Sequence, residues 1–81
     1  MEFDLRKPKH EYKHKPIYRK QISDHEFFII IWIREDGRAL TGYEDPIGNR
    51  YLCRRSRVRS TKDGLRFIVR DGITYPLPDD I

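Results

Sequence analysis

The chain has 81 residues, a formal net charge of +4 and one cysteine, Cys53. A chain of this length forms at most one domain, and a single cysteine excludes an internal disulfide. The longest apolar run, "FFIIIWI" at 27–33, is too short to cross a bilayer, and the charged N-terminus does not read as a signal peptide. We therefore expect a cytoplasmic protein that has no membrane partner.

Charge is segregated along the chain. Residues 6–20 hold seven basic residues and one acidic residue, and residues 50–70 hold eight basic residues and one acidic residue. Between these blocks, residues 21–49 hold two basic and six acidic residues. A protein that needs only solubility usually mixes the two signs over its surface. The segregation therefore favours an anionic partner.

Residues 1–25 are predicted to form a basic N-terminal arm that is extended or partly disordered. Pro8 and Pro16 leave too few residues between them for a stable helix. Basic tails of this kind neutralise phosphates without reading bases, which makes four residues candidate nucleic-acid contacts: Lys13, Lys15, Arg19 and Lys20. The alternative is a plain solvated tail.

The segment that follows, from Glu26, is rich in β-branched and aromatic residues and ends at Asp36-Gly37. An aspartate-glycine pair between apolar runs predicts a hairpin with a type I′ turn, because both residues tolerate positive φ. A two-residue turn pairs Glu35 with Arg38, which places Trp32 opposite Thr41.

The run 27–33 is apolar at its odd-numbered and at its even-numbered positions. Strand alternation places Phe28, Ile30 and Trp32 on one face, and Phe27, Ile29, Ile31 and Ile33 on the other. A small barrel buries one face of a strand, so the face with Trp32 needs a second cover. We expect the N-terminal arm to provide this cover. A second copy or a partner protein is the alternative.

Further strands are expected over 38–44, 50–60, 65–70 and 73–77, separated by a loop at 45–49 and turns at 61–64 and 71–72. The result is a mainly β domain over 26–81, a five-strand antiparallel meander. Short sequential strands commonly close into a partly open barrel, because closure removes exposed edges. An SH3-like barrel is preferred, and an OB-like barrel is the alternative.

The arginines of the strand 50–60 and of the next strand are the main candidate site. Alternation places Arg55, Arg57 and Arg59 on one face with Tyr51. A hairpin that pairs Ser60 with Leu65 sets Arg59 opposite Arg66 and Arg55 opposite Arg70. Like charges in opposition destabilise a sheet, and arginine binds phosphate well. The pattern predicts an anion-binding face with Tyr51 as a base-stacking ring. The alternative is a solvated outer face.

Other chemistry lacks a recognisable motif. His10, His14, His25 and Cys53 do not have the spacing of a metal site, and no phosphate loop or nucleophile motif is present. We expect no enzyme, cofactor or metal. The leading hypothesis is an accessory or regulatory nucleic-acid-binding protein, with RNA or single-stranded DNA favoured because no helix could enter a major groove. The alternative is an interaction module or inhibitor that binds an acidic protein or self-associates through 27–33.

Overall fold

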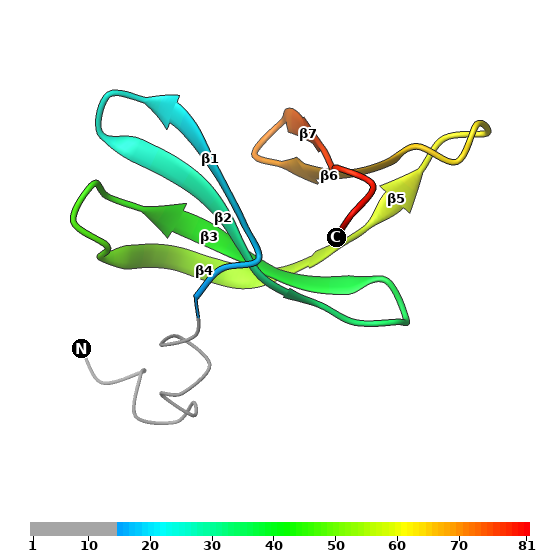
Figure 1. Ribbon diagram of the computed structural model, residues 1–81, viewed down its shortest axis with the longest axis horizontal. Helices are drawn as coiled ribbons and strands as arrows, with labels where there is room; N and C mark the ends of the chain where they lie inside the picture. The colour runs from blue at the N-terminus through cyan, green and yellow to red at the C-terminus, as the bar shows by residue number, and fades with distance from the viewer. Residues whose placement is uncertain (1–14) are drawn as a thin grey trace.

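The computed structural model describes residues 15–81 as seven antiparallel strands in two sheets (Figure 1). The first sheet has the order β1 (Tyr18–Ser23), β2 (Glu26–Ile33), β3 (Arg38–Glu44) and β4 (Arg50–Arg57). The second has the order β5 (Arg59–Ser60), β6 (Arg66–Arg70) and β7 (Ile73–Pro76). The prediction of a mainly β, antiparallel chain is confirmed. In residues 15–81 no helix could span a membrane.

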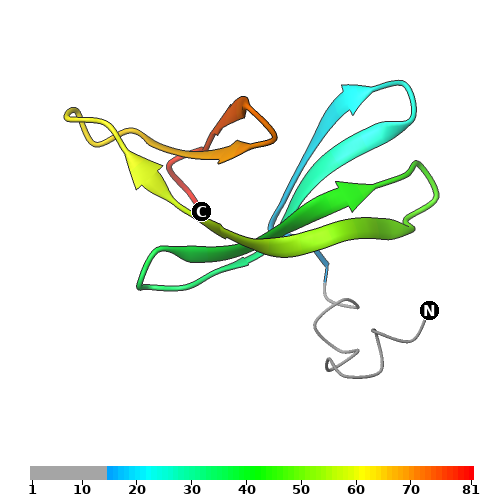
Figure 2. The ribbon, with the colours of Figure 1, turned by 180° about the vertical axis from the view of Figure 1, so that it is seen from behind.

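The strand expected over 50–60 is divided between the two sheets. β4 pairs with β3, whereas β5 pairs with β6, and Val58 lies between them. The N–H of Val58 donates to the carbonyl oxygen of Gly37 at 2.7 Å, which ties this junction to the tip of the β2–β3 hairpin (Figure 2). The described strands therefore form two packed sheets and not a closed barrel.

β1 is a strand that the sequence analysis did not predict. It lies within the segment assigned to the N-terminal arm, and it pairs with β2 from Tyr18 opposite Ile30 to Ser23 opposite Glu26. Tyr18 and Ile22 pack against the core, whereas the residues between them are exposed. Charged edge strands of this kind resist pairing with other chains, and their polar composition hides them from a search for apolar runs.

The three aspartate-glycine turns lie where they were predicted, but only one is a two-residue turn. Asp71 and Gly72 both have positive φ, at 53° and 82°, which is the signature of type I′. In the β2–β3 turn only Gly37 has positive φ, and the N–H of Arg34 donates to the carbonyl oxygen of Arg38 at 2.7 Å. This loop has three residues, as expected for a type I turn followed by a left-handed glycine.

The β2–β3 and β5–β6 loops each have three residues, where two and four were predicted, and each difference shifts the register by one residue. Trp32 lies opposite Leu40 where Thr41 was predicted. At the β5–β6 turn the N–H of Thr61 donates to the carbonyl oxygen of Leu65, and Arg59 lies opposite Phe67. The predicted pairing of Arg59 with Arg66 is therefore wrong.

The main core lies between the two sheets. Its buried residues are Phe28, Ile30, Ala39 and Tyr43 from the first sheet, and Ile68, Tyr75 and Leu77 from the second sheet and the segment after it. Phe28 stacks on Tyr75 with ring centroids 3.8 Å apart and an interplanar angle of 4°. Burying a side chain of this size contributes about 1.5–3 kcal/mol.

A bulge in β2 changes which side chains share a face. The register shifts between Ile30 and Trp32, so Ile31 is the extra residue. Phe28 and Ile30 are fully buried between the sheets, and Trp32 lies on the opposite, outer face of the first sheet. The predicted interaction surface of Phe28, Ile30 and Trp32 is therefore wrong as a single face.

The outer face of the first sheet carries a second apolar cluster. Ile29, Ile31 and Leu40 are buried there, and Phe27, Trp32 and Cys53 pack against them. β2 is thus apolar on both faces, as predicted. The predicted cover of Trp32 by the arm depends on residues 1–14, which lie outside the described residues.

Candidate functional site

A bulge in β4 decides which of its side chains face outward. The register against β3 shifts between Tyr51 and Arg54, which leaves Leu52 and Cys53 opposite Gly42. Leu52 has a φ of 54°. A Cβ atom on Gly42 would lie 2.7 Å from the Sγ atom of Cys53, so the crowded side of the bulge requires a residue without a side chain.

The bulge separates Tyr51 from the arginines predicted to share its face. Tyr51 faces inward, where its ring stacks on Tyr43 at 6.0 Å and its hydroxyl donates to Glu26 at 2.6 Å. The hydrogen bond to Glu26, together with desolvation, raises the pKa of Tyr51 to about 12. Arg55 and Arg57 face outward. The prediction that Tyr51 lies on the arginine face is therefore wrong.

Four exposed arginines lie in the cross-strand row of Trp32 or in the adjacent row, at the Gly37 end of the outer face. We call these residues the hairpin-end cluster: Trp32, Arg34, Arg38, Arg55 and Arg57. Arg57 lies opposite Arg38, whose carbonyl oxygen accepts the backbone N–H of Arg34. Trp32 and Arg55 flank Leu40 on either side, since both pair with it. Register thus places the five residues in two adjacent rows across the sheet.

The hairpin-end cluster keeps most of its positive charge. The Cζ atom of Arg34 lies 4.3 Å from the Trp32 ring centroid, and that of Arg55 lies 6.0 Å from it. Arg38 forms a 3.7 Å ion pair with Asp36, and both side chains are more than half exposed. An exposed pair of this kind is worth little. Among residues 15–81, no carboxylate forms an ion pair with Arg34, Arg55 or Arg57.

The two arginines at the other end of the outer face share one carboxylate. Glu44 is buried, and its two carboxylate oxygens accept hydrogen bonds from Arg19 at 2.7 Å and Arg50 at 3.1 Å. Burial alone would raise the pKa of Glu44, but these two hydrogen bonds outweigh it and hold the pKa below its ordinary value. The Cζ atom of Arg19 also lies 3.6 Å from the Phe27 ring centroid. This end of the face is a structural ion network.

Arg70 is buried between the sheets and is not part of an accessible surface. It is 2 % exposed, and it donates to Thr41 Oγ1 at 2.9 Å and to the Leu52 carbonyl oxygen at 2.5 Å. Its Cζ atom lies 4.9 Å from the Tyr43 ring centroid. In the predicted arrangement Arg70 was exposed opposite Arg55, which instead lies opposite Leu40.

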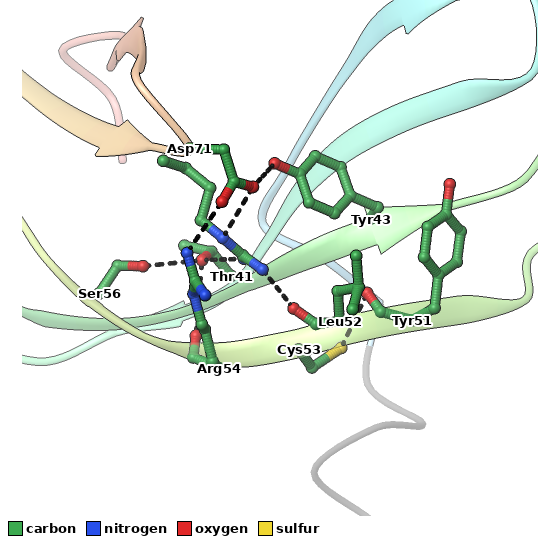
Figure 3. Close-up of polar contacts among 9 residues, drawn as sticks. Thr41, Tyr43, Tyr51, Leu52, Cys53, Arg54, Ser56 and Asp71 are labelled. Carbon is green, nitrogen blue, oxygen red and sulfur yellow. Dashed lines mark hydrogen bonds and ion pairs between the residues drawn. The ribbon is translucent and has the colours of Figure 1, made fainter.

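Asp71 joins this network from the β6–β7 turn (Figure 3). One carboxylate oxygen accepts the Tyr43 hydroxyl at 2.8 Å, and the other accepts Arg54 at 3.1 Å. The hydrogen bond from Tyr43 is the main cause that lowers the pKa of Asp71, and burial is the main cause that raises the pKa of Tyr43. Asp71 therefore holds the second sheet against the first by polar contacts.

The remaining predicted residues lie outside the two cross-strand rows of the hairpin-end cluster, although Arg66 lines the same pocket as Arg34. Arg59 is exposed in the second sheet, and Arg66 donates to the Ile81 carbonyl oxygen. Lys15 and Lys20 are exposed before and within β1, and Lys13 lies outside the described residues. Register thus brings Arg55 and Arg57 together but separates them from the other predicted contacts.

Arg34 and Arg38 were not among the site residues predicted from the sequence. They lie in residues 21–49, which have a net negative charge because six acidic residues outnumber these two arginines. The available signal was their position on either side of the Asp36-Gly37 turn. Residues that flank a hairpin turn meet across it, so these two were bound to be neighbours.

Within residues 15–81, no three histidine, cysteine or acidic side chains gather as a metal site would require. His10 and His14 lie outside the described residues. Comparisons with protein families, with curated proteins and with solved structures found no match for this chain. The candidate function therefore depends on the geometry of the hairpin-end cluster.

Proposed function

We propose that the protein binds nucleic acid through the hairpin-end cluster and serves as a non-enzymatic accessory or regulatory factor. The observation that carries the proposal is the alignment of Arg34, Arg38 and Arg57 across three neighbouring strands. Like charges placed opposite each other destabilise a sheet. A polyanion laid across the strands would relieve this repulsion.

Phosphate is the anion that best fits these side chains. The guanidinium group is planar, remains charged and donates two parallel hydrogen bonds to phosphate oxygens. Strands in a sheet lie about 4.8 Å apart, so arginines from β3 and β4 present a closely spaced row of donors. A repeating phosphate chain could engage several of them at once.

We also propose an SH3-like relationship for the fold, in preference to an OB-like one. Its support is the strictly sequential order of strands and the continuous passage from β4 to β5, which places one bent segment in both sheets.

The proposal is tested by a salt titration of binding to a labelled oligonucleotide, in single-stranded and duplex form. The variant Arg38→Gln, Arg55→Gln, Arg57→Gln should lower the slope of log K against log salt by about 2–2.7 units, since each phosphate contact contributes about 0.7–0.9. The control replaces two exposed cations that lie outside the cluster and outside the predicted contacts, Arg54 and Lys62, with glutamine. It should retain most of the slope.

Equal slopes for the parent and the cluster variant would show that the cluster does not bind phosphate. If the parent binds no oligonucleotide even at low salt, the function is not nucleic-acid binding. The alternative, an acidic protein partner, would then take its place.

A further inference from the structure

We propose that the hairpin-end cluster takes single-stranded nucleic acid, and that one unpaired base stacks on the Trp32–Arg34 pair. This inference depends on the proposed function, and it adds the form of the nucleic acid and the element that recognises it.

The Trp32 side chain packs against the first sheet, and the guanidinium group of Arg34 lies over its ring. It packs against the buried cluster of Ile29, Ile31 and Leu40 on the outer face. The Arg34 guanidinium lies 4.3 Å from the ring centroid. A guanidinium plane held by an aromatic ring offers its free side to a second planar group, and nucleic-acid bases stack on arginine planes as well as on aromatic rings.

The arrangement of charge around Trp32 fits a base with a phosphate beside it. Arg38 and Arg57 lie in one cross-strand row, and Arg55 lies in the same row as Trp32. Phosphates on either side of a stacked base would therefore meet guanidinium groups. In a duplex the bases are already stacked on their neighbours and turned away from the protein, so only an unpaired base can stack on the Trp32–Arg34 pair.

The experiment uses intrinsic fluorescence, because Trp32 is the one tryptophan of the chain. Three probes of equal length are compared: a single-stranded homothymidine oligonucleotide, an abasic sugar–phosphate strand and a duplex. The homothymidine and abasic strands present the same phosphates and differ only in their bases. Anisotropy of an end label measures affinity, and tryptophan emission reports contact at the cluster.

We expect the homothymidine strand to quench Trp32 and to bind about 5- to 150-fold more tightly than the abasic strand, the range that corresponds to stacking one base. The duplex should bind without quenching. Trp32→Leu should reduce the ratio between homothymidine and abasic strands to about one, whereas Trp32→Phe should retain part of it.

The outcomes separate this inference from the proposed function. Equal affinities of the parent for homothymidine and abasic strands, or unchanged emission on binding, would overturn base stacking while leaving phosphate binding intact. Binding of no strand at low salt would overturn both. These measurements use the unaltered protein, so they decide the question even if Trp32→Leu fails to fold.

Discussion

Replacing Gly42 with alanine should destabilise the protein through the β4 bulge. The new Cβ atom would lie 2.7 Å from Cys53 Sγ and 3.2 Å from both Cys53 Cα and the Tyr51 carbonyl oxygen. The thiol must leave its present position, and the two backbone atoms must move by a few tenths of an ångström. Overpacking of this kind costs about 1–3 kcal/mol. In a domain of this size, each kcal/mol lowers the Tm by about 4–8 °C.

A double-mutant cycle tests the cause of this loss. Gly42→Ala, Cys53→Ala and the double variant are unfolded in urea, with Trp32 fluorescence as the probe. Removal of Sγ eliminates the shortest contact, so the double variant should lose less free energy of unfolding than the two single variants combined, by about 1 kcal/mol. A Gly42→Ala protein as stable as the parent, or strict additivity, would refute this account of the bulge.

Two further predictions concern the ion networks. Glu44→Gln should melt at a lower temperature than the parent at neutral pH. The pKa of Glu44 is lowered in the folded state, so the ionised carboxylate stabilises the fold at pH values above the ordinary pKa of 4.5. This stabilisation is lost as the pH falls through the folded-state pKa. The difference in Tm should therefore close in acid, and a difference that is constant with pH would contradict the prediction. Arg70→Met should destabilise by about 1–3 kcal/mol because it removes the buried hydrogen bond to Thr41 Oγ1 and the part-buried hydrogen bond to the Leu52 carbonyl oxygen. The exposed control Arg54→Met should stay within about 0.5 kcal/mol, and an Arg70→Met protein as stable as the control would show that the buried arginine is dispensable.

Local chemistry in the sequence determined the class of structure and the places where the chain turns. Each aspartate-glycine pair supplies a residue that tolerates positive φ, a preference that does not depend on the rest of the fold. The β-branched and aromatic run at 27–33 predicts a strand that is apolar on both faces, and β2 has this character. The turn positions and the strand at 27–33 depend on residues adjacent in the sequence, so they can be predicted without knowing which residues pack against them.

Tertiary structure alone decided which side chains share a face. Strand alternation cannot reveal a bulge, and one extra residue reverses every assignment beyond it. In β4 the bulge allows Tyr51 to contact Tyr43 and Glu26 on one side of the sheet while Arg55 lies on the other. Its position depends on the space beside Gly42 on the neighbouring strand.

The charge pattern of the sequence likewise did not predict which arginines are exposed and which are buried or paired. The sequence located an arginine-rich strand, but pairing with distant residues determines the role of each arginine. Arg70 is buried against Thr41 and Leu52, whereas Arg57 joins Arg38 on the surface. Neutralisation requires a carboxylate close in space, and distance in space is set by sheet register and not by separation along the chain.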